Sequence, residues 1–325
     1  MKAAIHDVFG DPAEVLKCGT AARPQAAPGE VVLKVLLSPI HNHDLWTVRG
    51  SYGVKPALPA IGGSEAVGII ADVGEGVDPG LTGKRVAAAG LAGSWAEYVT
   101  ASAASLIPLP DGVSDEIGAQ LVAMPFSAIT LLDFVDVAPG DCVVQTAANG
   151  AVGKVFAALA SARGVKTVNL VRRQEAVAEL EKLGVENVIA TDQADWLEKA
   201  QALVGEKGAR AAVDSVGGKM AMALCDLIGE DGLLVTFGTA TGAPLALSSG
   251  TIIFKQLTVK GFWGKKVSDD MALEKKTTLF GELLRLAVSG ALPLPVGGIF
   301  SLDEVADAAR AALVPGRAGK ILLKP

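Results

Sequence analysis

The sequence predicts an α/β protein with a doubly wound parallel sheet and a second, β-rich domain. From about Ser114 onward, short apolar strands alternate with helical stretches, which is typical of a parallel sheet with crossover helices. A glycine motif directly follows the first of these strands. Before about Pro110 the chain is instead rich in Gly, Pro and short Val/Ile/Leu runs, which indicates β structure.

The alternating region begins with an apolar helix expected over about 117–135 and a turn at 138–141. Helices separate six expected strands, at 142–147, 166–171, 186–190, 210–215, 232–237 and 256–263. An amphipathic helix over about 273–289 and a short β tail follow. We expect the tail to return to the β-rich domain.

Composition and charge exclude several classes of protein. The 325 residues, of which 50% are hydrophobic and 20% charged, can form two domains with a sizeable core. A net charge of -6 argues against nucleic acid or an anionic membrane as a partner. No signal peptide is visible, and the apolar runs are far shorter than the roughly 20 residues needed to cross a bilayer. We therefore expect a cytoplasmic protein with a small-molecule substrate.

The three cysteines, Cys18, Cys142 and Cys225, are far apart in the sequence. Their spacing indicates neither a disulfide framework nor a tetrathiolate zinc site. Buried, reduced thiols are the expectation.

The glycine motif follows the strand expected at 142–147 and precedes a helix, which is the context that a Rossmann dinucleotide site requires. Ala148 is small enough for a tight turn, Gly150 lets the backbone approach a pyrophosphate, and Gly153 lets the helix pack close to the strand. The phosphates would then lie at the helix N-terminus. The predicted cofactor contacts in the motif are Ala148, Asn149, Gly150, Ala151, Val152 and Gly153.

Arg172 and Arg173 follow the second strand, 19 positions after Gly153. Enzymes that use NAD usually have Asp or Glu here, because a carboxylate accepts hydrogen bonds from the ribose 2′-hydroxyl. Guanidinium groups instead form charge-assisted bonds to a 2′-phosphate. The pair therefore predicts NADPH as the cofactor; a solvated basic turn is the alternative.

Two of the three histidines, His41 and His43, raise the question of a metal site. The two histidines supply at most two ligands from an extended segment, whereas a catalytic zinc needs about three converging ligands. We therefore expect no metal. Proton donation would then fall to another hydrogen-bonding group. Of the two tyrosines, Tyr98 lies in an alternating strand pattern, whereas Tyr52 lies in a loop between Gly and Pro residues. Such loops often carry function, so Tyr52 is either a catalytic residue or a loop-packing residue.

Several segments, taken together, resemble a known family; they are 44–59, 62–65, 145–153, 171–173, 215–219, 235–238, 253–257 and 261–263. Essentially the whole chain resembles the medium-chain dehydrogenases/reductases, in which a GroES-like catalytic domain in two pieces flanks a Rossmann domain. The resemblance implies a GroES-like domain from residues 1–118 and 265–325 and an NADPH-binding domain from 119–264. Zinc-dependent members typically have Cys in place of His41 and His in place of Ser64, so the zinc-free branch is implied.

Within that branch the chain most resembles the mitochondrial-type 2-enoyl thioester reductases. The most specific similarity is Gly-Phe-Trp at 261–263 after Ile-Phe-Lys at 253–255. The resemblance places the catalytic tyrosine on Tyr52. It places further cofactor contacts on Phe237, Gly238, Phe262, Trp263 and Lys320, in addition to the glycine motif and the two arginines. The aromatic residues among these could instead belong to the core, and Lys320 could be a solvated tail residue.

Two departures from the enoyl reductase pattern leave the substrate open. His41 and Met124 stand where that family usually has Asn, at positions near the nicotinamide and the substrate. The resemblance implies reduction of a trans-2-enoyl thioester by NADPH. An NADPH-dependent quinone or enone reductase is the alternative, and a non-catalytic NADPH-binding protein is a third. Because the strand at 256–263 would be an apolar sheet edge, we expect a homodimer.

Overall fold

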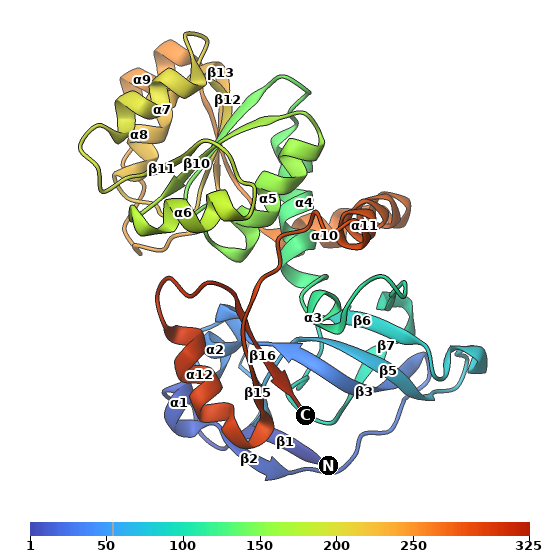
Figure 1. Ribbon diagram of the computed structural model, residues 1–325. Helices are drawn as coiled ribbons and strands as arrows, with labels where there is room; N and C mark the ends of the chain where they lie inside the picture. Colours follow the sequence, from blue (N-terminus) through green and yellow to red (C-terminus); the bar gives the residue numbers. More distant parts are fainter. Residues whose placement is uncertain (54) are drawn as a thin grey trace. The chain divides into compact units, whose positions relative to one another are not determined.

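The computed structural model describes residues 1–53 and 55–325 and contains one largely parallel and one largely antiparallel sheet system (Figure 1). Contacts divide the chain into two units. The first comprises residues 1–123, 284–289 and 294–325, and the second comprises residues 124–283 and 290–293. The predicted α/β fold class, a doubly wound parallel sheet together with a second, β-rich part, is confirmed.

The sheet of the second unit has six parallel strands in the order β11-β10-β9-β12-β13-β14. All six predicted strands are present, as β9 (Cys142–Gln145), β10 (Lys166–Val171), β11 (Val188–Ala190), β12 (Ala209–Asp214), β13 (Ile228–Thr236) and β14 (Thr258–Gly261). The chain runs outward from β9 to one edge, then returns and runs to the other. The strand order therefore reverses between β9 and β12, where doubly wound sheets bind their ligands.

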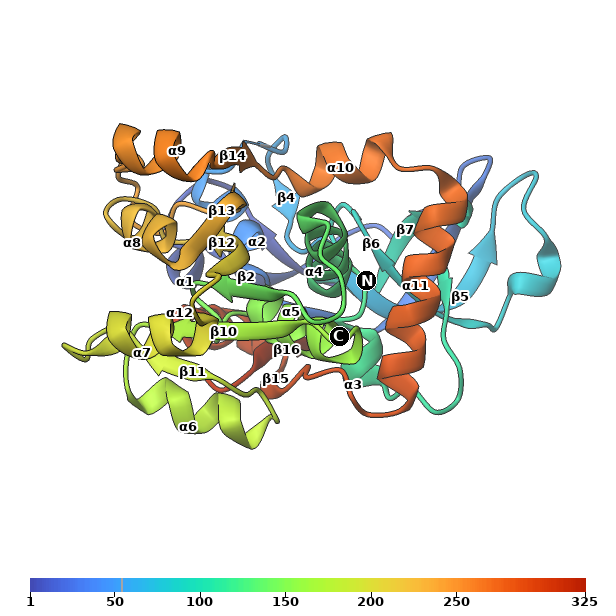
Figure 2. The ribbon, with the colours of Figure 1, turned by 90° about the horizontal axis from the view of Figure 1, so that it is seen from above.

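Helices pack against this sheet in two groups. One apolar cluster joins α5 (Ala151–Ala162) and α6 (Glu175–Lys182), and another joins α7 (Trp196–Val204) and α8 (Met220–Leu227). On α5, Val155, Phe156 and Leu159 are fully buried, as their helical spacing predicts. Figure 2 shows α9 (Ser249–Lys255) and β14 at one edge of the sheet.

The single helix predicted over about 117–135 is wrong near its beginning. The structure has α3 (Asp115–Gly118), then four non-helical residues, then α4 (Ala123–Val135). The backbone amides of Val122 and Ala123 donate to the Glu65 carboxylate, at 2.7 and 3.0 Å. Amides at a helix N-terminus lack partners inside the helix, so this carboxylate favours a helix start at that point.

The first unit contains two sheets. The larger follows the order β15-β16-β3-β5-β6-β8, with β7 also paired to β3, and the smaller has the order β2-β1-β4. Their strands are β1 (Lys2–His6), β2 (Lys17–Thr20), β3 (Glu30–Pro39), β4 (Ala60–Ile61), β5 (Glu65–Val73), β6 (Arg85–Ala89), β7 (Tyr98–Ser102), β8 (Ile107–Pro108), β15 (Val296–Ser301) and β16 (Lys320–Lys324).

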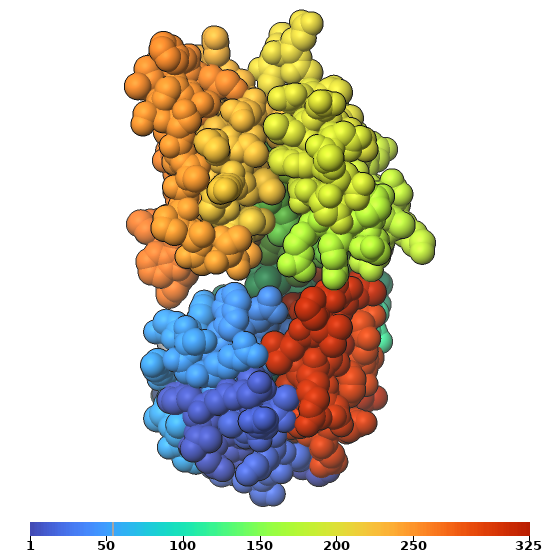
Figure 3. Space-filling view, turned by 90° about the vertical axis from the view of Figure 1, so that its left-hand side faces the viewer, coloured from blue at the N-terminus to red at the C-terminus, as the bar shows by residue number. Residues whose placement is uncertain are grey.

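The C-terminal tail returns to this first unit, as predicted. Leu322 and Leu323 on β16 pair with Pro39 and Ser38 on β3. Helix α12 (Val305–Leu313) buries its apolar face in the same core as α1 (Pro12–Val15) and α2 (Asn42–Arg49). Figure 3 shows this C-terminal segment, in red, lying against the N-terminal segment, in blue.

Most of the length of helices α10 (Gly264–Asp270) and α11 (Leu273–Val288) belongs to the second unit. The Phe280 ring on α11 stacks on Phe126 of α4 with centroids 4.4 Å apart. Glu282 pairs with Arg163 at 2.8 Å. These contacts tie α11 to the second unit, while the assignment of domains at 118/119 and 264/265 stays a prediction.

All three cysteines are free thiols; Cys225 is buried, and Cys18 and Cys142 are only partly buried. Among the helices described, none has the length and apolar character needed to span a membrane.

Candidate active site

The glycine motif forms the turn between β9 and α5. Ala147 carries the left-handed backbone conformation of the turn, with φ of 52°. Ala148 is buried, and its amide donates to Leu170 O at 3.1 Å, which holds the turn against the end of β10. A Cβ on Gly153 would lie 2.7–2.9 Å from Ala148 backbone atoms. Glycine at 153 therefore permits the close helix-to-strand approach that the motif predicts.

The N-terminus of α5 is open to a ligand. Gly150 is its N-cap residue, and no side chain caps the helix. The first intrahelical bond joins Lys154 N to Gly150 O at 3.1 Å, so the amides before Lys154 have no partner inside the helix. Free amides and the positive end of the helix dipole suit a phosphate group. This end of α5 fits the pyrophosphate of a dinucleotide.

Arg172 and Arg173 directly follow β10, which is the neighbour of β9 in the sheet. Both side chains are exposed, and neither forms an ion pair within residues 1–53 and 55–325. Since parallel strands end at the same sheet edge, the two guanidinium groups lie on the edge that carries the turn of the glycine motif. They fit a second anionic group beside the pyrophosphate site.

Asp214, at the end of β12, is a residue that the sequence analysis missed. Its carboxylate is fully buried and accepts from the Thr146 hydroxyl at 3.1 Å and from the Val216 amide at 2.9 Å. Its backbone oxygen also accepts from the amides of Phe237 and Gly238, at 2.8 and 3.1 Å. Asp214 thus orders two loops at the carboxyl edge of the sheet. An acidic residue directly after a buried strand was the available signal.

The predicted aromatic cofactor contacts differ in exposure. Phe262 is 7% exposed and packs against Phe134 and Phe237, with centroids 5.3 and 5.8 Å apart. Trp263 is 67% exposed. The Phe262 side chain is therefore mostly buried against two aromatic rings, whereas Trp263 is open to a ligand.

Met124 and Lys320 lie in different units. Met124 is in the first turn of α4 and is half-buried. Lys320 begins β16 and is only 8% exposed, so it is not the solvated tail residue considered as an alternative. Whether either contacts cofactor or substrate stays a prediction.

The expectation of an extended segment at His41 and His43 is wrong. His41 is the N-cap of α2, and His43 lies in its first turn. Asp44 Oδ2 accepts from the His41 amide at 3.0 Å, which fixes the start of the helix. The two imidazole rings stack with centroids 5.0 Å apart and an interplanar angle of 14°. Both rings therefore lie at the N-terminus of α2.

His41 and Glu65 form a buried pair. The distance between His41 Nε2 and Glu65 Oε2 is 2.6 Å. Burial raises the pKa of Glu65 to about 7, although the amides of Val122 and Ala123 oppose this shift. Burial holds the pKa of His41 well below its ordinary value, and the positive charge of Lys320 acts in the same direction. Below about pH 7, Glu65 therefore keeps its proton and shares it with an uncharged His41.

A second polar chain lies beside this pair. His43 Nε2 is 2.9 Å from the Ser64 hydroxyl, which donates to Asp44 Oδ1 at 2.6 Å. The Tyr52 ring lies near His43, with ring centroids 5.9 Å apart, and its side chain is 41% exposed. The Tyr52 hydroxyl has no hydrogen-bond partner in the described part of the chain. Val54, within the segment that carries the family resemblance, lies outside the described residues.

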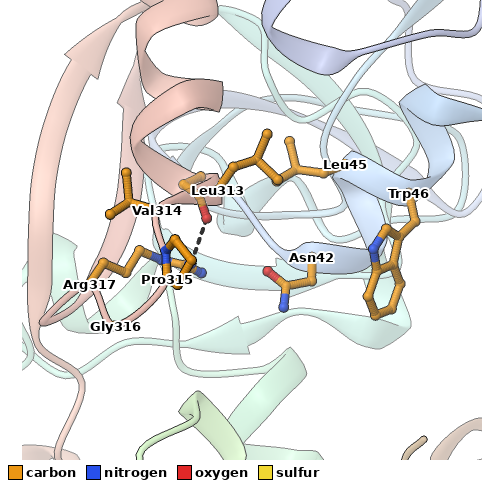
Figure 4. Close-up of a pocket in the computed structure, with 9 residues that line it drawn as sticks. Asn42, Leu45, Trp46, Leu313, Val314, Pro315, Gly316 and Arg317 are labelled. Atoms are coloured by element: carbon orange, nitrogen blue, oxygen red, sulfur yellow. Dashed lines mark hydrogen bonds between the residues drawn. The ribbon is translucent and has the colours of Figure 1, made fainter. Parts of the chain in front are cut away.

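A cavity of about 270 Å³ lies next to these residues, between α2 and the end of α12 (Figure 4). It is lined by Asn42, Leu45, Trp46 and residues 312–317. The Arg317 guanidinium lies at this cavity without a carboxylate partner in the described ranges. Burial lowers the pKa of Arg317, and its Nη1 donates to Ala312 O. The lining therefore offers an indole, an amide and one cation.

The described side chains do not supply a zinc site. No group of three or more His, Cys, Asp or Glu residues in the described ranges could hold a metal ion. His41 and Glu65 bond to each other, and His43 bonds to the Ser64 hydroxyl. The absence of zinc stays a prediction. Metal analysis of the purified protein would test it.

Two family models match the chain. One, described as a zinc-binding dehydrogenase, matches residues 151–275, and the other, the alcohol dehydrogenase GroES-like domain, matches residues 27–111. The human mitochondrial enoyl-[acyl-carrier-protein] reductase is 31% identical over 330 residues, covering 99% of this chain and 88% of the relative. The mitochondrial enoyl-[acyl-carrier-protein] reductase of Caenorhabditis elegans is 32% identical over 299 residues, covering 89% of this chain and 85% of the relative.

Solved structures extend the similarity along the full chain. A quinone oxidoreductase from Pseudomonas syringae has a TM-score of 0.85 and 26% identity, covering 100% of both chains. A mycobacterial protein complexed with NADPH also has a TM-score of 0.85 and 26% identity, covering 100% of both chains.

Proposed function

The chain belongs to the medium-chain dehydrogenase/reductase family, and we propose that it catalyses the NADPH-dependent reduction of an activated carbon-carbon double bond, in a trans-2-enoyl thioester. The observation that carries the proposal is Tyr52, whose hydroxyl is exposed and unpartnered among the described residues. The family's catalytic tyrosine falls on this position. Relatives about 30% identical along nearly the whole chain are enoyl reductases, which supports the same substrate class.

The choice of NADPH rests on the carboxyl edge of the parallel sheet. The open N-terminus of α5 would hold the pyrophosphate, and Arg172 and Arg173 would hold the 2′-phosphate. A similar protein of known structure is complexed with NADPH. The further contacts proposed are Phe237, Gly238, Phe262, Trp263 and Lys320.

Bound NADPH would supply a hydride to the β-carbon of the substrate. Negative charge would then develop on the thioester oxygen. A hydroxyl that has no protein partner can donate to that oxygen without breaking another bond, so Tyr52 would stabilise the enolate. Because the His41–Glu65 pair is neutral, Glu65 adds no negative charge near the site where the enolate would form.

A quinone or enone reductase is the second candidate. The structural similarity to a quinone oxidoreductase favours it, as does His41 at a position where the enoyl reductases usually have Asn. Hydride transfer to a quinone or enone requires no thioester recognition. The third candidate, a non-catalytic protein, would bind NADPH without turnover.

We also propose a cytoplasmic homodimer. β14 is the edge strand of its sheet, and all four of its residues are exposed. Beside it, Ile253 and Phe254 on α9 are 59% and 85% exposed. An exposed sheet edge with exposed apolar side chains beside it favours pairing with a second copy, which light scattering during size-exclusion chromatography would detect.

The experiment that separates the candidates is NADPH oxidation measured side by side with crotonyl-CoA, a simple quinone and an enone. The proposal predicts the highest kcat/KM with crotonyl-CoA. A higher value with the quinone or the enone would support the second candidate. Tight NADPH binding with no turnover on any of the three would support the third.

A further inference from the structure

We propose that His43 is a further catalytic residue, which donates the proton that the α-carbon of the substrate receives. The proposal rests on the proposed function, because it requires a double bond reduced by hydride. It stands on the arrangement of Asp44, Ser64, His43 and Tyr52 within the first unit. Tyr52 would hold the carbonyl oxygen while His43 delivers the proton to carbon.

The hydrogen-bond chain determines which nitrogen of His43 is free. The Ser64 hydroxyl donates its only proton to Asp44 Oδ1 at 2.6 Å. Ser64 Oγ can therefore only accept from His43 Nε2, which lies 2.9 Å away. Nε2 must then carry a hydrogen in both the neutral and the charged ring, so the proton that His43 gains or loses is the one on Nδ1.

Nδ1 is the atom available to a substrate. Among the residues described, no group bonds to it, and the His43 side chain is 27% exposed. The Tyr52 ring lies 5.9 Å from the imidazole, centroid to centroid. The Tyr52 hydroxyl and His43 Nδ1 thus belong to neighbouring side chains. Neither donates to another group in the described part of the chain.

A buried carboxylate lies close to His43. Asp44 Oδ1 is 3.4 Å from Nε2, and Asp44 is only 4% exposed, so its negative charge acts at short range. It also offsets the positive end of the α2 dipole, since it lies in the same first turn. The His41 ring, which stacks on His43, has a pKa well below its ordinary value and adds no positive charge. Ser64 and Tyr52 are further polar neighbours of His43.

The step balances without another reactant. The β-carbon takes the hydride, and the electron pair of the double bond moves to form the enolate. The N–H bond at Nδ1 then breaks, its electrons remain on Nδ1, and a new C–H bond forms at the α-carbon. His43 is left neutral with its hydrogen on Nε2, and solvent restores the proton at Nδ1.

His43→Gln tests this step, because glutamine can donate a hydrogen bond but cannot transfer a proton. Turnover of crotonyl-CoA should fall by roughly 10² or more, while the Kd for NADPH stays unchanged. In D2O the wild type should add deuterium to one face of C2, and His43→Gln should give both faces. The matched control is His6→Gln, in β1 of the same unit, which should keep the wild-type turnover and facial selectivity.

Chemical rescue separates proton donation from packing. We expect added imidazole to restore part of the turnover of His43→Ala, with the restored rate following the imidazolium concentration as pH is varied. Turnover within twofold of wild type for His43→Gln, with deuterium still on one face, overturns the proposal. So does an unrescued His43→Ala that still binds NADPH. If the wild type reduces no enoyl thioester, the proposed function fails before any variant is made.

Discussion

His41 and Glu65 are joined by a 2.6 Å hydrogen bond between Nε2 and Oε2, and neither side chain is more than 1% exposed. Burial is the largest cause of both pKa shifts, so each group would stay shifted without its partner. In the folded protein the pair holds one proton up to about pH 7. In the unfolded chain, Glu65 has its ordinary pKa of 4.5 and His41 its ordinary pKa of 6.5. Between pH 4.5 and 6.5 the two residues therefore again hold one proton, which is on His41. Between pH 4.5 and 6.5 the pair therefore does not change how the free energy of unfolding depends on pH.

Replacing one partner should reveal the titration of the other. In His41→Gln, the folded state keeps the Glu65 proton up to about pH 7 and the unfolded chain loses it above 4.5. The free energy of unfolding should therefore fall between pH 4.5 and 7 relative to wild type, by up to about 1.4 kcal/mol per pH unit.

Glu65→Gln should show the opposite slope. The unfolded chain takes a proton on His41 below its ordinary value of 6.5, and the folded state does not. Stability should therefore fall as pH decreases below 6.5. Urea unfolding across pH 4.5–7 measures both slopes, with the wild type run in parallel. If the free energy of unfolding of both variants depended on pH as that of the wild type does, His41 and Glu65 would not share a proton.

Arg172→Ala combined with Arg173→Ala should raise the KM for NADPH at least about tenfold and change that for NADH much less. The reason is the loss of charge-assisted bonds to the 2′-phosphate, which are worth roughly 1.5–3 kcal/mol each. Lys199→Ala with Lys207→Ala is the matched control, since it removes two exposed positive charges from the same unit. Equal changes for the two cofactors would rule out the assignment of the arginines.

Tyr52→Phe should lower kcat with crotonyl-CoA by roughly 10² or more while leaving NADPH binding intact. The substitution removes only the hydroxyl, which has no partner to lose in the described part of the chain. Tyr98→Phe is the control, because Tyr98 is half-buried in β7, under the Arg23 guanidinium. Unchanged turnover in Tyr52→Phe would exclude Tyr52 from the reaction.

Gly153→Ala should destabilise the protein by about 1–3 kcal/mol, because its Cβ would overlap the backbone of Ala148 at 2.7–2.9 Å. Gly281→Ala makes the same change in the interior of α11, where no atom lies within 4 Å of the added Cβ. Helix propensity predicts that it stabilises the protein by up to about 1 kcal/mol. Thermal unfolding compares the two; equal shifts in Tm would show that the approach at Gly153 is not tight.

Periodicity and turn chemistry predicted the parallel sheet well. The six strands and the return of the tail follow from local apolar patterns, which residues near in sequence determine. The break between α3 and α4 could not be predicted from local apolar patterns. It depends on the Glu65 carboxylate, which is 57 positions from Val122 in the chain.

The site was predicted in its residue types more than in its geometry. The Tyr52 loop and the glycine motif carry local signals, and both lie in the predicted kinds of structure. The stacking of His41 on His43 depends on where α2 begins, which the Asp44 cap decides. The order that Asp214 gives to its two loops comes from bonds between neighbouring strands. Such contacts over long sequence separations leave little local pattern.

The most direct test of the central claim is the stoichiometry of the reaction with crotonyl-CoA. Purified protein, NADPH and crotonyl-CoA would be incubated without oxygen, and NADPH loss would be compared with butyryl-CoA formed, by mass spectrometry. Our account predicts one butyryl-CoA for each NADPH oxidised. NADPH oxidation without butyryl-CoA, or no oxidation at enzyme concentrations that bind NADPH fully, would contradict it.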